Sequence, residues 1–442
     1  MAHLPLTGVR VIDFCVAWAG PYATMLLGDL GAEVIKVENP RVWQPMTRGG
    51  RARPTRESLQ GMGGMYGGYP NDRPGPRPWN YAPTFVQLYR NNRSFSVDLR
   101  SPEGMDILRR LVERSDVFVE NNASDTMEKI GISYEWLRSI REDIIMLRIP
   151  AYGLDGSYAE ARALGVHLEA VMGHTLLRGY PDMDPTANSI IFAGDYFAGL
   201  HGALAAMLAL WHRKETGRGQ LVELAQAEAA SAMFAQAYME HAINGQAQQP
   251  LGNRSVYGAA PCGVYPCRPA DTPSNGGDRW IALTVTSDAA WESLRLEMGD
   301  PAWAADPALA TCEGRRNHQD LLDEQLAMWT AQFDDYELFH RLQAAGIAAA
   351  PVLEASRTFD DPHLRERRVF QPATMFDNVG TFPFLAPFYR FPETPATIRQ
   401  APVAMGEHND YVYRELLGFT EEEYNRLCMA GHITTDFDES IA

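Results

Sequence analysis

The chain has 442 residues and a formal net charge of −17, with 45% hydrophobic and 21% charged residues. This length is enough for two or three domains with buried cores, and the composition is that of a globular protein. The acidic balance argues against a nucleic-acid-binding protein, because neutralising phosphates requires a basic surface. No apolar run reaches the roughly 18 residues that a membrane-spanning helix needs. We therefore expect neither nucleic acid nor a membrane as a partner.

The five cysteines are scattered and odd in number, and they suggest no disulfide framework. Cys262 and Cys267 lie five positions apart with no second Cys or His pair nearby, so we predict no metal site. The opening residues show neither the charged region nor the apolar region of a signal peptide. These features favour a cytoplasmic protein with reduced thiols.

The N-terminal third alternates between short apolar runs and amphipathic segments. We predict strands at 9–14, 33–38, 93–99, 116–120 and 144–149, and helices at 20–30, 101–114 and 134–141. This alternation implies an α/β fold with a doubly wound parallel sheet, whose ligands bind at the carboxyl ends of the strands. The first strand–helix turn reads Trp18-Ala19-Gly20-Pro21 and lacks the glycine-rich dinucleotide fingerprint, so we reject a NAD or FAD site.

Residues 41–80 are rich in Gly, Pro and Arg, and their length and composition predict a surface loop. Two interpretations are equally supported. The segment either covers an active site or a partner-binding surface, or it is a mobile insertion.

The stretch 187–228 contains the most distinctive pattern in the chain. A short apolar run ends in Gly194-Asp195, and small residues then recur at helical spacing, including Gly199 and Gly202. They predict a helix with a narrow face that lets a ligand, or another backbone, come close. The helix ends in a basic, glycine-containing break before a strand at 220–224. By residue type alone, the commoner role for Asp195 is an N-cap.

The character of the sequence changes after Glu228. We predict a helix to Asn244 and a linker at 246–252, followed by antiparallel strands around a turn at 275–278. Helices at 288–298, 319–332 and 335–345 and a strand at 347–352 complete a smaller α+β unit. The last ninety or so residues look less regular, with a helix at 410–417 and a polar tail.

Several blocks in this order resemble the family III CoA-transferases, also called the CaiB/BaiF family. They are LTGVRVIDF and AGPYATMLLGDLGAEVIKVE, then NRSFSVDLRSPEG, SDVFVENN, AGDYFAGLHGALAAMLALWHRKETGRGQLVELAQAE, GIAAAPV and GEHND. The family includes formyl-CoA, carnitine and benzylsuccinate CoA-transferases and is related to 2-methylacyl-CoA racemases. The resemblance covers nearly the whole chain.

The resemblance implies a Rossmann-like CoA-binding domain at 1–228, a helical linker at 229–252, and a small α+β domain at 253–352. The segment 353–442 would return to the large domain, and two chains would interlock as a dimer. A homodimer is expected, and a heterodimer with a homologous subunit stays open. The implied substrates are an acyl-CoA and a small carboxylic acid, with no tightly bound cofactor.

By the same resemblance, Asp195 is the nucleophile and carries CoA as an aspartyl thioester. Further positions follow from the family pattern. The expected CoA-binding residues are Trp18, Ala19, Asn39, Arg48, Arg100, Asn121, Asn122 and Lys129, and the expected substrate pocket contains Gly165, His167, Glu169, Gly276 and Gly277.

Two departures from the formyl-CoA transferase pattern concern the acceptor acid. Trp18 stands where those members carry glutamine, and Gly165 stands where they carry glutamate. The bulkier side chain of Trp18 and the missing carboxylate at Gly165 suit an acceptor acid larger than formate or oxalate. Such an acid would be either aromatic or dicarboxylic. Two alternatives stay open: a racemase, in which a histidine such as His167 pairs with Asp195 to exchange the α-proton of an acyl-CoA, and a non-catalytic subunit of a heteromeric transferase.

Overall fold

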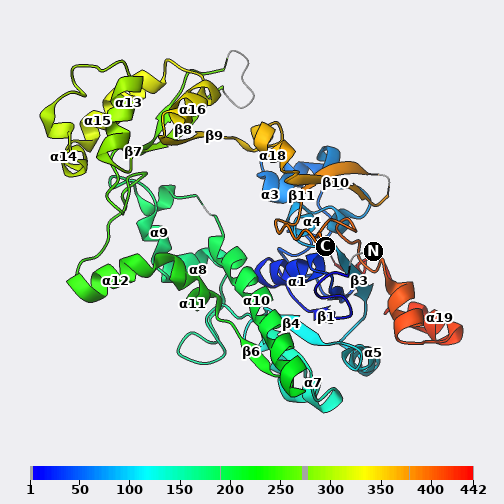
Figure 1. The fold of residues 1–442 in the computed structure, drawn as a ribbon. Helices are drawn as coiled ribbons and strands as arrows, with labels where there is room; N and C mark the ends of the chain where they lie inside the picture. The colour runs from blue at the N-terminus through cyan, green and yellow to red at the C-terminus, as the bar shows by residue number, and fades with distance from the viewer. Residues whose placement is uncertain (1–2, 190, 271–276, 378, 442) are drawn as a thin grey trace. The chain divides into compact units, whose positions relative to one another are not determined.

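Figure 1 shows the computed structural model, which describes residues 3–189, 191–270, 277–377 and 379–441. The chain divides into two compact units. Unit 1 consists of Met1–Met172, Ile190–Tyr238 and Arg368–Ala442, and unit 2 consists of Gly173–Ser189 and Met239–Arg367. The chain therefore returns to unit 1 at Arg368 after completing unit 2.

Unit 1 is built on a six-stranded sheet with the order β3-β2-β1-β4-β5-β6. All neighbouring strands are parallel, as predicted. The strands are β1 (Arg10–Asp13), β2 (Glu33–Glu38), β3 (Asn92–Ser96), β4 (Val117–Glu120), β5 (Ile145–Arg148) and β6 (Leu221–Glu223). The order reverses between β1 and β4, and open α/β sheets bind ligands beyond the carboxyl ends of the strands at such a point.

Helices cover both faces of this sheet. Successive residues of a strand point to opposite faces, so each strand contributes side chains to two cores. Val11 of β1 packs in a core with helices α1 (Ala19–Asp29) and α10 (Ala193–Thr216). The next residue, Ile12, packs in a separate core with helix α5 (Pro102–Val112). The sheet is therefore doubly wound.

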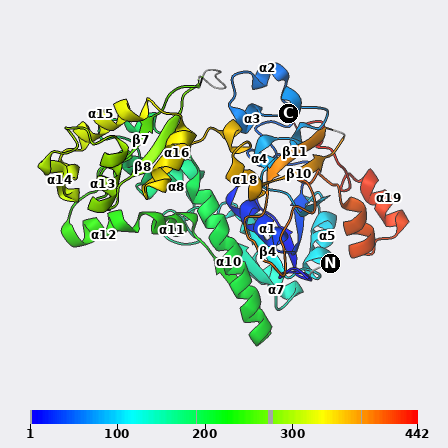
Figure 2. The same ribbon diagram turned by 45° about the horizontal axis from the view of Figure 1, so that its top comes forward.

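The small residues of α10 bring it close to α1, and both figures draw the two helices side by side (Figures 1 and 2). A Cβ added to Gly199 would lie 2.6 Å from the carbonyl oxygen of Ala19, and one added to Gly202 would lie 2.9 Å from Ile149. We predicted that this face lets a ligand or another backbone come close. At Gly199 the backbone of α1 does come close, which confirms that part of the prediction. A ligand at this face stays a prediction.

The Gly/Pro/Arg-rich segment is mostly exposed, as predicted for a surface loop, but it contains several short helices that were not predicted. They are α2 (Arg56–Leu59), α3 (Gly64–Gly67) and two 3-10 turns, η1 (Pro70–Asp72) and η2 (Pro78–Asn80). Tyr69 and Trp79 are buried and anchor the segment to unit 1.

The other helices before the C-terminal part are α4 (Pro83–Val86), α6 (Thr126–Lys129), α7 (Tyr134–Ile140), α8 (Gly165–Val171), α11 (Gln226–Ser231) and η4 (Ala232–Phe234), with α12 (Ala235–Asn244) crossing into unit 2.

The C-terminal part of unit 1 is more regular than its sequence suggested. It forms an antiparallel hairpin of β10 (Phe370–Met375) and β11 (Gly380–Leu385), a π-helix η6 (Tyr411–Leu416) and helix α19 (Glu421–Met429). Tyr413 of η6 donates a hydrogen bond to the carbonyl of Ser96, at 2.8 Å, which fixes this part to the β3 edge of the sheet. The predicted polar tail therefore contains a helix, α19.

Unit 2 contains a three-stranded antiparallel sheet in the order β7-β8-β9. The predicted antiparallel strands and the later strand are confirmed, and their order was not predicted. Its strands are β7 (Cys262–Pro266), β8 (Trp280–Thr284) and β9 (Ala348–Val352). Its helices are α9 (His174–Leu177), η3 (Pro185–Ala187), α13 (Asp288–Glu297), η5 (Pro307–Leu309), α14 (Cys312–Asn317), α15 (Gln319–Thr330), α16 (Asp335–Ala344), α17 (Ala355–Thr358) and α18 (Pro362–Glu366). Trp291 and Leu294 of α13 are buried in its core. Among the helices of either unit that the structure describes, none has the length and apolar character of a bilayer span.

Candidate active site

Asp195 lies in the first turn of α10, close to the point where the backbone turns into the helix. Phe192 occupies the N-cap position in a left-handed conformation (φ 52°, ψ 32°), and no side chain caps the helix. The interpretation of Asp195 as an N-cap is therefore wrong. Asp195 is only 8% exposed, so its carboxylate is not an ordinary solvated surface charge.

A cavity of about 90 Å³ contacts Asp195 at the carboxyl edge of the unit 1 sheet. Its wall includes the turn that follows β1, Asn121 after β4 and Ala151 after β5, so it lies at the reversal point of the strand order. The lining residues are Val16, Ala17, Trp18, Met46, Asn121, Ala151, Ala163, Leu164, Gly165, Leu168, Phe192, Asp195 and Gln226. Among these residues Asp195 carries the one titratable side chain.

The surroundings of Asp195 oppose its ionisation. Burial, and then the nearby charge of Glu169, raise the pKa of Asp195 to about 7. Glu169 is itself buried in α8 and accepts a hydrogen bond from the backbone N–H of Ala193 at 2.9 Å, which holds it beside the first turn of α10. The Oδ2 atom of Asp195 has no hydrogen-bond partner among the described residues. A buried carboxylate oxygen without a partner is poorly stabilised and is a suitable nucleophile.

Gly165 is the first residue of α8 and lies directly against Asp195. A Cβ built at Gly165 would stand 2.1 Å from Asp195 Oδ2 and 2.9 Å from the ring of Phe192. Only glycine fits at position 165, because α8 lies so close to the Asp195 carboxylate. The site nevertheless keeps a second carboxylate near Asp195, because Glu169 follows one helical turn later on α8.

We predict that Gly165→Ala lowers kcat about a hundredfold, because the new methyl group must displace either α8 or the Asp195 carboxylate from its position. Gly194→Ala is the matched control. Its Cβ would meet its nearest neighbour, Ala230, at 3.8 Å, an ordinary contact, although Gly194 precedes Asp195 directly. Steady-state kinetics of both variants test the prediction, and equal losses in the two would contradict it.

Of the two predicted residues at the β1–α1 turn, Trp18 lines the cavity and Ala19 does not. Trp18 is buried with its ring edge-on to Phe192, at 4.3 Å between centroids. Asn121 accepts a hydrogen bond from the N–H of Val16 at 2.8 Å and donates one to its carbonyl at 2.9 Å. Asn122 donates to the carbonyl of Phe14, at 3.1 Å. The two asparagines thus fix the turn, and Ala19 is buried behind Trp18 as the first residue of α1.

Arg48 is buried outside the lining of this cavity. Its guanidinium donates to Glu38 at 2.7 Å and to the carbonyl of Trp79 at 2.9 Å, and it stacks on the Phe85 ring at 3.7 Å. Burial acts to raise the pKa of Glu38, but the adjacent Arg48 outweighs it and lowers the pKa. In this structure the guanidinium stabilises the fold, and a role in CoA binding stays a prediction.

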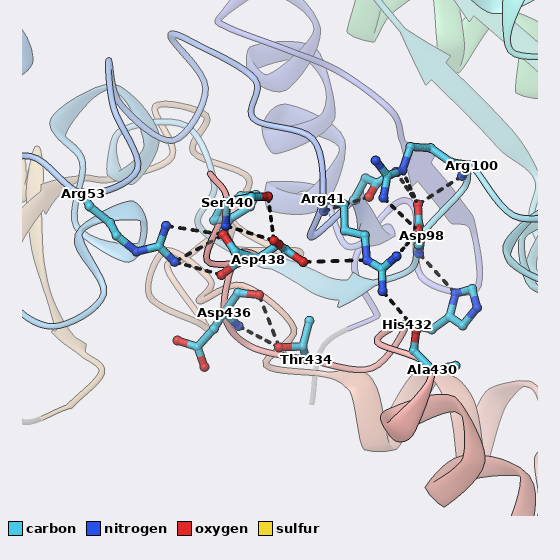
Figure 3. Close-up of polar contacts among 12 residues, drawn as sticks. Arg41, Arg53, Asp98, Arg100, Ala430, His432, Thr434, Asp436, Asp438 and Ser440 are labelled. Atoms are coloured by element: carbon cyan, nitrogen blue, oxygen red, sulfur yellow. Dashed lines mark hydrogen bonds and ion pairs between the residues drawn. The ribbon is translucent and has the colours of Figure 1, made fainter. Parts of the chain in front are cut away.

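Asn39 and Arg100 belong to a second polar cluster, centred on Asp98 (Figure 3). Asp98 accepts hydrogen bonds from Arg100 at 3.0 Å and from Asn39 at 3.3 Å, and it pairs with Arg41 at 3.5 Å. Arg41 also reaches Asp438 of the C-terminal segment at 4.0 Å. Of the predicted CoA-binding residues, Trp18 and Asn121 therefore line the cavity, whereas Asn39 and Arg100 belong to this cluster.

The remaining predicted residues that the structure describes are not among those that line the cavity. Lys129 is exposed on α6 and pairs with Asp125. His167 is exposed, and its Nδ1 accepts a hydrogen bond from the N–H of Leu164 at 3.0 Å, which caps α8. In unit 2 the carbonyl of Gly277 accepts a hydrogen bond from Ala270 at 2.9 Å. Gly276 falls outside the described residues.

Nine of the lining residues were not predicted from the sequence, and three of these nine are instructive. Met46 comes from the Gly/Pro/Arg-rich segment, and no periodicity there indicated that it faces a site. Phe192 ends the short apolar run that precedes Gly194. Gln226 could have been found, because it follows a predicted strand at the carboxyl edge of the sheet, and its side chain donates to the carbonyl of Ile149 at 2.9 Å.

Comparison with known proteins gives a consistent assignment. A profile of CoA-transferase family III matches residues 6–409. Succinyl-CoA–D-citramalate CoA-transferase from Chloroflexus aurantiacus is 30% identical over 423 residues, which cover 95% of this chain and 96% of that protein. Succinate–glutarate CoA-transferase from Agrobacterium fabrum is 29% identical, covering 93% and 96%. The crystal structure of a CaiB/BaiF family protein from Brucella suis matches with a TM-score of 0.76 and 27% identity, covering 93% of this chain and 99% of that one. The resemblance seen in the sequence is thereby confirmed, and this chain belongs to CoA-transferase family III.

Proposed function

We propose that this transferase moves CoA from an acyl-CoA to a free carboxylic acid through a thioester on Asp195. The observation that carries the proposal is the cavity in which Asp195 is the one titratable side chain among the described lining residues. A buried carboxylate can act as a nucleophile without an accompanying base. Acid–base chemistry on the substrate would need a second titratable group in contact with it, and Glu169, although close to Asp195, is not among the lining residues.

The proposed reaction has two exchanges. Asp195 attacks the donor thioester carbonyl, the C–S bond breaks, and CoA leaves as a thiolate from a mixed anhydride of Asp195 and the acyl group. The thiolate then attacks the Asp195 carbonyl carbon, which releases the donor acid as a carboxylate and leaves an aspartyl-CoA thioester. The acceptor carboxylate repeats both steps in reverse. No proton or water is consumed, so the energy of the thioester is retained.

We propose a dicarboxylic acid of the size of succinate to glutarate as the acceptor. Three related CoA-transferases support this class, because they are named for D-citramalate, for L-malate, and for succinate and glutarate. The apolar wall formed by Trp18 and Phe192 suits an acid with a carbon chain better than it suits formate or oxalate. Aromatic acids form the second class that the sequence suggested, and no relative named above supports them.

An acceptor series tests this assignment. With succinyl-CoA as donor, we expect glutarate and L-malate to be converted with a kcat/KM at least tenfold above that of formate, because a missing carbon chain forfeits its packing energy. Chromatography of the CoA esters formed measures the rates, and benzoate reports on the aromatic class. Formate or oxalate as the best acceptor would refute the assignment.

The raised pKa of Asp195 predicts the pH dependence of the reaction. Attack requires the ionised carboxylate. Burial, and then the nearby charge of Glu169, raise the pKa of Asp195 to about 7. We therefore expect kcat/KM to fall about tenfold per pH unit below this value and to level off above it. Rates measured from acid to mildly alkaline pH check this prediction, and a profile that is flat down to pH 5 would contradict it.

The racemase alternative receives less support from the geometry. His167 is exposed and caps α8, and it does not line the cavity that contains Asp195. The subunit alternative is kept open by two relatives from Chloroflexus aurantiacus, named as the alpha and beta subunits of succinyl-CoA–L-malate CoA-transferase and each 29% identical to this chain. We propose a homodimer, and transfer activity of the purified chain alone would support it over a heteromer.

A further inference from the structure

The indole of Trp18 presents a buried hydrogen-bond donor without a partner. The side chain is 4% exposed, and its Nε1 atom contacts no acceptor among the described residues. The ring is held edge-on against Phe192 and lies 6.4 Å from Tyr196, so it is fixed by packing on more than one side. A buried donor without a partner destabilises a protein, and such a donor in a ligand site indicates an acceptor supplied by the ligand.

The other polar side chains of the cavity already have partners. Asn121 donates to the carbonyl of Val16, and Gln226 donates to the carbonyl of Ile149. Asp195 Oδ2 is the acceptor without a partner, and Trp18 Nε1 is the donor without a partner. Trp18 and Asp195 therefore line the same cavity, and each carries a buried polar atom without a partner among the described residues.

We propose that the Trp18 indole N–H stabilises the oxyanion that forms when Asp195 attacks the substrate carbonyl. This inference rests on the proposed function. In the step concerned, a bond forms between Asp195 and the thioester carbon, the C=O π electrons move onto the oxygen, and the indole N–H donates to it. When the oxygen regains its double bond, the C–S bond breaks and CoA leaves as a thiolate. A donor fixed by packing stabilises such a charge without the cost of reorganisation.

The chain offers a matched control for this donor. Trp79 is also buried and its Nε1 also lacks a partner, but it packs with Phe437 and Met405 away from the cavity. Trp79→Phe therefore makes the same chemical change as Trp18→Phe outside the site. A general effect of losing a buried indole will appear in both variants.

The test compares Trp18→Phe, Trp18→Gln and Trp79→Phe with the wild-type enzyme, using succinyl-CoA and glutarate. We expect Trp18→Phe to lower kcat roughly a hundredfold, as removal of one oxyanion donor does, with the KM for succinyl-CoA nearly unchanged. Trp18→Gln, which regains a donor but loses the aromatic packing, should be faster than Trp18→Phe. Trp79→Phe should keep the wild-type kcat.

The order of the two Trp18 variants decides between a donor and a packing role. A kcat for Trp18→Phe equal to the wild type, or above that of Trp18→Gln, would overturn the inference. So would a raised KM for glutarate with kcat unchanged, which would assign Trp18 to recognition of the acceptor. Failure of the proposed function looks different, because the wild-type enzyme itself would then form no aspartyl-CoA adduct.

Discussion

Replacing Asp195 by asparagine is expected to lower kcat at least about a thousandfold, because the substitution removes the nucleophile and leaves the shape of the site intact. The amide cannot form the mixed anhydride or the thioester. Since α10 and the β1–α1 turn keep their packing, we expect the variant to bind acyl-CoA as the wild type does. The measurement is steady-state transfer from succinyl-CoA to glutarate, with binding of CoA followed by calorimetry.

A matched control is Glu142→Gln, which neutralises an exposed carboxylate elsewhere in unit 1. It should retain the wild-type rate. Full activity of Asp195→Asn would contradict the proposed mechanism. If that full activity appeared only in the presence of a homologous partner, the chain would be a non-catalytic subunit.

The Asp195→Asn substitution is also expected to stabilise the protein at neutral and alkaline pH. Burial raises the pKa of Asp195 to about 7 from the ordinary value of 3.8. Below pH 3.8 the carboxyl is protonated in both the folded and the unfolded chain, so its burial adds no penalty that depends on pH. As pH rises from 3.8 to about 7, the unfolded state gains by ionising, and folding becomes less favourable by up to about 4 kcal/mol. Asp195→Asn removes this penalty.

Urea unfolding at pH 5 and pH 8 measures the effect. The free energy of unfolding of Asp195→Asn should exceed that of the wild type at both values, and the excess should be about 3 kcal/mol larger at pH 8. An excess that does not grow with pH would show that Asp195 is ionised at little cost in the folded state. Loss of activity with gain of stability is the behaviour of a residue retained for chemistry.

The sheet could be predicted from the sequence because β1, β4 and β5 each contain a short apolar run, and helical segments lie between the strands. Val11 and Ile12 face opposite cores, so β1 is buried on both faces. The β10–β11 hairpin was missed because Pro372 and Pro383 lie inside its strands, where proline is unfavourable. Helix α19 was missed because its composition is polar, although Thr420 and Glu423 form a capping box visible in the sequence.

The site was predictable only in part. Asp195, Trp18, Asn121 and Gly165 follow from the resemblance, and the structure brings them to one cavity. The electrostatics of the site depend on tertiary contacts that no local pattern encodes. The charge that raises the pKa of Asp195 comes from Glu169 on another helix, and the absence of a partner for Trp18 Nε1 depends on every residue packed around it.

The most direct test of the account is mass spectrometry of the enzyme after incubation with succinyl-CoA and no acceptor. The proposal predicts a peptide containing Asp195 that is heavier by the mass of CoA less one water, and it predicts that glutarate discharges this adduct. Asp195→Asn should give no such peptide. A wild-type enzyme that transfers CoA at full rate while no adduct forms on Asp195, or while the adduct forms on another residue, would contradict the central claim.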